Sequence, residues 1–271
     1  MLEGLWLREE LENKLLYIFI FGLIFTILSV LISEIVFPSS TGLVSVFLVS
    51  LVSAYPMITY LRKKESEEME KKMSEEKLLK RHEDELAIYL SFFLGVMLGF
   101  AISTFYAPPN FFQTQEEVIL SIRGTLAGSA FNSTFFHTII TNNLWVFFLT
   151  FLLSLLLSAG MIFVVVWNAS VLGVFLAKAS DNITQFHLLA ISYLPHGLLE
   201  IAAYILAGIS GALISYQVDY YFIRNTPYKL EAVLRAMKDA VILIVIGLAC
   251  LLLAGVIEAV SYTHLTLPTK A

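Results

Sequence analysis

The sequence predicts an all-α, polytopic helical membrane protein with about seven hydrophobic segments. Two observations predict this fold class. Hydrophobic residues make up 58% of the 271 residues and charged residues only 14%, and the mean hydropathy is +0.80. Apolar runs also recur along the chain, each long enough at about 1.5 Å per residue to cross a hydrocarbon core of about 30 Å. Because lipid offers the backbone no hydrogen-bond partners, these runs must be helices.

Residues 1–61 are predicted to form an N-terminal extension of two transmembrane helices. Apolar runs cover residues 15–37 and 43–61, and Pro38 lies between them. The first run is not followed by a small-residue cleavage site, and the second run follows it at once. We therefore expect a retained helix rather than a signal peptide.

Residues 62–86 form a charged linker that we expect to be a solvated helix. The stretch contains eight Lys or Arg and nine Asp or Glu residues. Opposite charges fall three or four positions apart, which supports a helix in water. We interpret this linker as a connector rather than as a binding surface.

Residues 87–259 are predicted to form a membrane core of five segments. Gly95 and Gly99 form a small-xxx-small motif, which packs helices closely either within one chain or between subunits. The run 142–180 spans about 58 Å as a helix, barely two crossings. It is therefore either two short spans that meet near residues 158–160 or a deep re-entrant hairpin.

Counting Lys and Arg in the short loops predicts the orientation in a cell membrane. The linker has the largest number, and the 217–238 loop has four. The positive-inside rule therefore puts the N-terminus, the linker and the 217–238 loop in the cytoplasm. The 107–141 loop is then outside, and we expect Gln115 in it to be accessible from that side.

The element Pro195-His196-Gly197-Leu-Leu-Glu200 lies within an apolar run. Proline removes a backbone donor and disfavours helix at the preceding residue, so we expect a helix break at Pro195 and Gly197. His196 and Glu200, four positions apart, would share one face of the restarted helix. Counting from His187, Glu200 would lie about 18 to 20 Å deep, where an unpartnered carboxylate is costly.

Two interpretations of these polar residues remain open. In one, the His196 and Glu200 pair handles a proton, a cation or a metal. In the other, the pair forms interhelical hydrogen bonds with the amides of Asn142, Asn143 and Asn168. Two residues lack the third ligand that a zinc site needs, so metal binding is not decided.

Several classes of function have no support in the sequence. The net charge of −5 argues against nucleic-acid binding. The single cysteine, Cys250, permits no internal disulfide. The chain has no G-x-S-x-G, H-E-x-x-H or phosphate-loop motif, so we expect neither an enzyme nor a cofactor.

Residues 260–269 read Val-Ser-Tyr-Thr-His-Leu-Thr-Leu-Pro-Thr. This stretch matches the translation of a sequencing adapter residue for residue. We therefore predict that residues 260–271 are an adapter-derived artefact, and we leave them out of the fold prediction.

The polar elements of the core resemble the stage II sporulation protein M family. The resemblance rests on Asn142-Asn143, on Asn168 followed by Gly173, and on Pro195-His196-Gly197-x-x-Glu200. It covers residues 83–259, and Ala169 stands where members usually carry glycine. The helix pair and the linker before this core resemble an extension of archaeal members.

The resemblance implies a membrane scaffold or accessory subunit, because the namesake works in a membrane complex beside peptidoglycan-degrading partners. The expected partners are the lipid bilayer and membrane or envelope proteins. The alternative is a transporter, channel or ion-coupled protein that uses the His/Glu pair. The oligomeric state is not predicted.

Overall fold

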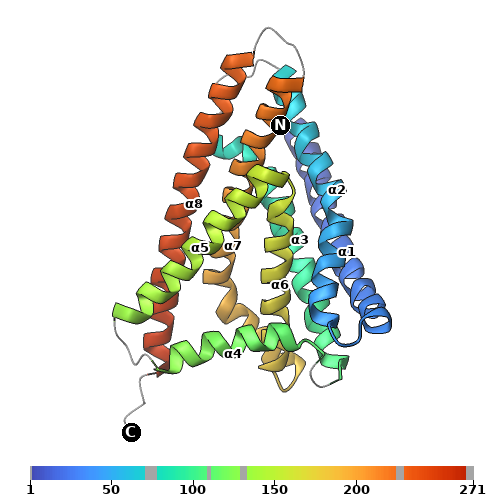
Figure 1. Ribbon diagram of the computed structural model, residues 1–271, viewed down its shortest axis with the longest axis vertical. Helices are drawn as coiled ribbons and strands as arrows, with labels where there is room; N and C mark the ends of the chain where they lie inside the picture. Colours follow the sequence, from blue (N-terminus) through green and yellow to red (C-terminus); the bar gives the residue numbers. More distant parts are fainter. Residues whose placement is uncertain (1, 71–77, 109–110, 129–132, 224–228, 267–271) are drawn as a thin grey trace.

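The computed structural model describes residues 2–70, 78–108, 111–128, 133–223 and 229–266 (Figure 1). These residues form eight helices: α1 (Leu2–Val36), α2 (Thr41–Glu70), α3 (Leu78–Tyr106), α4 (Gln113–Gly128), α5 (Ser133–Leu157), α6 (Gly160–Lys178), α7 (Ile183–Ile223) and α8 (Lys229–Thr266). Seven of these helices, all except α4, are long and apolar enough to cross a membrane. The predicted all-α, polytopic fold is confirmed.

The spanning helices pack in two groups, and α6 of the first group also contacts the second. Helices α1, α2, α3 and α6 form one group, whereas α5, α7 and α8 form the other. Contacts of α6 with α5 and α7 join the groups (Figure 1). Helix α4 lies across one end of the bundle, and the last turns of α7 and the first turns of α8 lie at the opposite end (Figure 1). The N-terminal helices therefore belong to the same bundle as the core.

The small-xxx-small motif packs inside the chain, against α1. A Cβ atom on Gly95 would overlap the carbonyl oxygen of Phe19, and one on Gly99 would lie 2.7 Å from Cβ of Thr26. Gly22 on α1 is equally close to α3, because its Cβ would lie 2.9 Å from the carbonyl oxygen of Phe92. The motif therefore packs two helices of the same chain, which is the first of its two predicted uses.

Helices α5 and α6 meet at a tight turn, so the 142–180 run makes two short spans. The spans are Ile140–Leu157 and Gly160–Lys178. Ser158 has a positive φ of 54°, which lets the chain reverse between them. The hydroxyl of Ser154 accepts a 3.0 Å hydrogen bond from the backbone N–H of Met161 and satisfies one donor at the start of α6.

The charged linker consists of two helix ends. Helix α2 continues past its membrane span to Glu70, and α3 begins at Leu78. Residues 71–77 of the predicted linker helix lie outside the described part. At the other end of the chain, α8 continues to Thr266, so part of the adapter-like stretch is helical, and residues 267–271 lie outside the described part.

Gln115 is buried, contrary to the expectation that it is accessible. Its side chain lies on the inner face of α4, where Nε2 donates hydrogen bonds to the carbonyl of Gly42 (3.1 Å) and the hydroxyl of Ser170 (3.3 Å). One residue later, Glu116 forms a 2.6 Å ion pair with Lys178 at the end of α6. Residues 107–141 are therefore not a free loop, because α4 within them is attached to α2 and α6.

Candidate functional site

The candidate site is a polar cluster where α5 meets α7. The Nδ2 atom of Asn143 donates a 2.6 Å hydrogen bond to Oε1 of Glu200. Asn142 in turn donates from Nδ2 to Oδ1 of Asn143 at 3.3 Å. Asn142 is therefore hydrogen-bonded to Asn143, and Asn143 is hydrogen-bonded to the carboxyl group of Glu200 on α7. This is the interhelical arrangement that the second interpretation predicted for these three residues.

A third helix adds a second carboxyl group. Glu258 of α8 lies within electrostatic range of Glu200. Tyr204 follows Glu200 by one helical turn, is only 2% exposed, and lies within electrostatic range of both carboxyl groups. Glu258 was missed in the sequence, although it is the only charged residue between positions 240 and 259. That isolation in an apolar run was the available signal.

The residues of the cluster lie at different positions along their own spans. Asn143 is the fourth residue of the α5 span, and Glu258 is the last residue of the α8 span. At about 1.5 Å per residue, Asn143 is about 5 Å from the end of its span. Glu200, in contrast, is the 17th of the 35 residues of the α7 span, in the middle of that span. The α7 span is longer than one straight crossing needs. The depth of Glu200 in a bilayer therefore stays a prediction.

The predicted helix break at Pro195 and Gly197 is wrong, because α7 continues through both residues. A proline inside a helix loses one backbone hydrogen bond, whereas ending the helix in an apolar environment would leave several groups unpaired. A Cβ atom on Gly197 would meet nothing within 4 Å. Glycine is thus not required there by close packing within the described part of the chain.

His196 is buried, with 8% of its surface exposed. It does not take part in the hydrogen bonds that link Asn142, Asn143 and Glu200. Its ring lies against Tyr193, with centroids 5.6 Å apart. The Nδ1 atom has no hydrogen-bond partner among the described residues. The predicted pairing of His196 with Glu200 is therefore replaced by the pairing of Glu200 with Asn143.

Asn168 also lies outside the cluster. Its Nδ2 atom donates a 2.8 Å hydrogen bond to the carbonyl of Val164, one turn earlier in α6. Gly173, which follows it, packs directly against the backbone of Met97 on α3. This part of the family-like pattern therefore serves the contact between α3 and α6 rather than the candidate site.

A second polar cluster lies in residues that the sequence assigned to the solvated linker. Nδ1 of His82 and Oε2 of Glu85 are 2.5 Å apart, and the two side chains are 2% and 0% exposed. Tyr89, one turn further along α3, is 1% exposed. The assignment of residues 62–86 to solvent is thus wrong at this end. Charge pattern alone does not show which face of a helix packs on its neighbours.

The chemistry of the site is that of hydrogen bonding between helices. The amide of Asn143 donates to the carboxyl group of Glu200, and the carboxyl group of Glu258 lies within electrostatic range of it. Among the residues that the structure describes, no group of three or more His, Cys, Asp or Glu side chains is placed to hold a metal ion.

Comparison with known proteins gives two findings. The family described as stage II sporulation protein M matches residues 87–261, which include Asn142, Asn143 and Glu200. The chain is also similar to an uncharacterized protein of Methanocaldococcus jannaschii, with 29% identity over 123 residues, 45% of this chain and 68% of the relative. No solved structure matches the chain.

Proposed function

Because the chain belongs to the stage II sporulation protein M family, we propose that it is a non-enzymatic membrane scaffold or accessory subunit of a membrane complex. One observation carries this proposal. The glutamate of the Pro-His-Gly-x-x-Glu element accepts a 2.6 Å hydrogen bond from Asn143 on another helix. The most distinctive polar residues of the core are thus used to hold helices together.

The way in which the extension packs supports the same role. Helix α1 contacts α3 through Gly22, Gly95 and Gly99, positions where a Cβ atom would be crowded. Close backbone packing of this kind favours a rigid bundle. A rigid bundle with polar ends can hold partners in a fixed arrangement. We propose the bilayer and membrane or envelope proteins as the partners, in a cell membrane with the N-terminus and linker in the cytoplasm.

Affinity purification tests the scaffold proposal. The full chain is tagged, extracted in mild detergent from its native membrane and quantified together with the proteins that it retains. We expect one or more membrane or envelope proteins in a constant molar ratio across detergents. The matched comparison is Asn143→Ala against Gly197→Ala, since only the first removes an interhelical hydrogen bond. A chain that is always isolated alone, including after chemical crosslinking in the membrane, contradicts the proposal.

A second candidate function rests on one observation, the proximity of Glu258 to Glu200. Carboxyl groups within membrane-spanning helices often bind a proton or a cation. Reconstitution into proteoliposomes tests this candidate. Ion flux that is lost in Glu200→Gln, with Asn168→Ala as the control, favours transport. Absence of flux under both a proton and a sodium gradient favours the scaffold.

A further inference from the structure

Three stretches of the chain carry the triplet Asn-x-Ser/Thr, in which x is not proline. They begin at Asn132, Asn168 and Asn182. This triplet is the acceptor for N-linked glycosylation at surface positions of proteins that face the outside of the cell. The triplet alone does not show whether a site is used, because a transferase must also reach it. Asn132 lies outside the described residues, and the surroundings of the other two differ.

The triplet at Asn168 is closed to a transferase. It lies within the Gly160–Lys178 span of α6. Nδ2 of Asn168 donates a 2.8 Å hydrogen bond to the carbonyl of Val164. Ser170, at the third position of the triplet, is 0% exposed. The acceptor nitrogen is therefore already bonded and the hydroxyl is buried, so this triplet is a matched internal control.

The triplet at Asn182 is exposed at both positions that define it. Asn182 and Thr184 are exposed, and they lie where the chain passes from the α6 span, which ends at Lys178, into the α7 span. Oδ1 of Asn182 accepts a 2.9 Å hydrogen bond from the backbone N–H of Gln185 and so caps α7. That bond uses the side-chain oxygen and does not involve Nδ2, the atom to which a glycan is joined.

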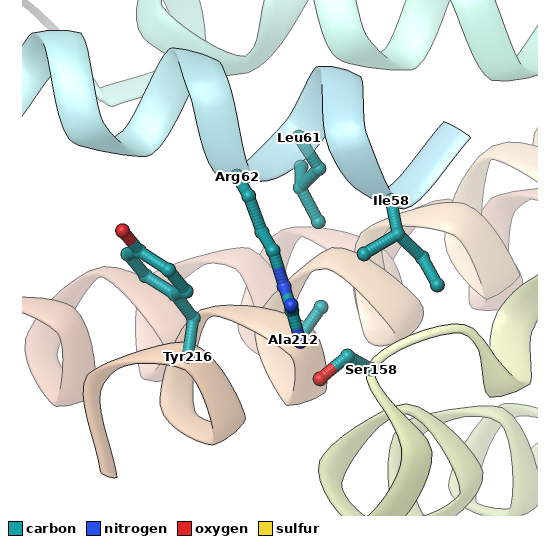
Figure 2. Close-up of a pocket in the computed structure, with 6 residues that line it drawn as sticks. All are labelled: Ile58, Leu61, Arg62, Ser158, Ala212 and Tyr216. Atoms are coloured by element: carbon teal, nitrogen blue, oxygen red, sulfur yellow. The ribbon is translucent and has the colours of Figure 1, made fainter. Parts of the chain in front are cut away.

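The connection that carries Asn182 lies at the outer end of the bundle in the proposed orientation. Lys178, at its start, forms a 2.6 Å ion pair with Glu116 of α4, which lies across one end of the bundle (Figure 1). At the other end of α6, Ser158 of the preceding turn lines the same small crevice as Arg62, the first residue of the charged linker (Figure 2). The positive-inside rule puts that linker in the cytoplasm, so the Asn182 connection faces outward.

The connection has the composition of a segment in water. Residues 178–182 read Lys-Ala-Ser-Asp-Asn, and Asp181 is exposed as well as Asn182. The α7 span has 35 residues, whereas one crossing of the hydrocarbon core needs about 20. The first turn of α7, with Thr184, therefore does not have to enter the core. A transferase at the outer surface can reach both positions of the triplet.

We propose that Asn182 is N-glycosylated on the outer face of the membrane. A separate membrane transferase joins Nδ2 to the anomeric carbon of a lipid-linked oligosaccharide. The bond between this carbon and the phosphate oxygen of the carrier lipid breaks, the phosphate leaves with the bonding electrons, and the amide gives up one proton. Thr184 supplies the hydroxyl of the triplet. The inference rests on the membrane orientation given under the proposed function and is independent of the scaffold role.

Glycopeptide mass spectrometry tests the proposal. The full chain is purified from its native membrane and digested, and the peptides that contain each triplet are analysed before and after removal of glycans. We expect a carbohydrate mass on the Asn182 peptide and none on the Asn168 peptide. Asn182→Gln should remove this mass completely, and Asn168→Gln should leave it unchanged.

Changes at Thr184 separate glycosylation from folding. Thr184→Ala should also abolish the carbohydrate mass, whereas Thr184→Ser, which keeps the hydroxyl, should retain it. Thr184→Ala leaves the Oδ1 cap of α7 in place, so it decides the question if Asn182→Gln does not fold. A carbohydrate mass that survives Thr184→Ala would contradict the assignment to this triplet.

Two further readouts distinguish failure of the proposal from failure of the orientation. Carbohydrate on Asn132 but not on Asn182 would overturn the proposal, because a transferase would then reach the outer side and leave this triplet unmodified. An unmodified chain whose exposed Glu117, replaced by cysteine, is labelled from outside would overturn the proposal and leave the orientation standing. If that cysteine is labelled only after the membrane is opened, the orientation fails together with the proposal.

Discussion

Asn143 on α5 donates a 2.6 Å hydrogen bond to the carboxyl group of Glu200 on α7, a residue 57 positions later in the chain. The bond connects α5 directly to α7. Interhelical hydrogen bonds in membrane proteins contribute about 0.6 kcal/mol on average and up to about 2 kcal/mol. The predictions below follow from this contact and from the packing around it.

Replacing Glu200 should separate its hydrogen-bonding role from its charge. Glu200→Gln keeps a side-chain oxygen that accepts the bond from Asn143, whereas Glu200→Ala leaves that amide buried without its acceptor. We expect Glu200→Ala to lower the free energy of unfolding by about 1 to 3 kcal/mol, and Glu200→Gln to lower it much less. Unfolding in mixed micelles, followed by circular dichroism, measures both. Equal losses in the two variants would show that the charge matters more than the hydrogen bond.

Removing the second carboxyl group should stabilise the bundle. Glu258 lies within electrostatic range of Glu200. Two ionised carboxylates at that range repel each other, so Glu258→Gln should raise the stability at pH 8.5 by an amount on the order of 1 kcal/mol. Repulsion needs both groups to be charged, and it therefore weakens as the pH falls. The gain should shrink at pH 5. Thermal unfolding at both pH values measures this, with exposed Glu34→Gln as the control. A destabilised Glu258→Gln would instead indicate a bound cation between the carboxyl groups.

Two glycine substitutions should have opposite effects. Gly95→Ala puts a methyl group against the carbonyl of Phe19, whereas the same change at Gly197 meets nothing within 4 Å. We expect Gly95→Ala to cost about 1 to 3 kcal/mol. Gly197→Ala should be neutral or should stabilise by up to about 1 kcal/mol, because alanine favours helix. Unfolding in detergent compares the two. A harmless Gly95→Ala would mean that α1 does not pack on α3 as described.

Cysteine labelling in intact cells tests the orientation, in a Cys250→Ala background. Glu117 on α4 is exposed, and Gln115 beside it is buried. An impermeant maleimide should therefore label Glu117→Cys, and it should label Gln115→Cys only after unfolding. Lys63→Cys should react only after the membrane is opened, because the positive-inside rule puts it in the cytoplasm. Labelling of positions 63 and 117 from the same side would contradict the alternation of the spans.

The sequence predicted the membrane spans well because hydropathy is a property of each segment alone. The apolar runs from residue 15 onward correspond to the seven spanning helices. Length left two alternatives for the 142–180 run, two short spans or a deep re-entrant hairpin, and the structure has two short helices, Ile140–Leu157 and Gly160–Lys178. The turn at Ser158 lies between these two helices. The resemblance to the family also identified Asn143 and Glu200, which the structure brings together.

The remaining features depend on which helices become neighbours. His82 and Glu85 belong to a charged stretch, and only the packing of α3 shows that they are buried. Gln115 is buried because α4 folds back onto α2 and α6. Local rules also predicted a break at Pro195, but keeping the helix costs less than exposing several backbone groups to lipid. These outcomes follow from tertiary contacts, which one sequence does not show.

A double-mutant cycle at Asn143 and Glu200 tests most directly the claim that the polar core holds helices together. The free energy of unfolding is measured in the same micelles for the unmodified chain, Asn143→Ala, Glu200→Ala and the double variant. The account predicts a coupling free energy of about 1 kcal/mol, because the two single changes remove the same bond. Effects that add to within about 0.3 kcal/mol would contradict it, because the two side chains would then act independently.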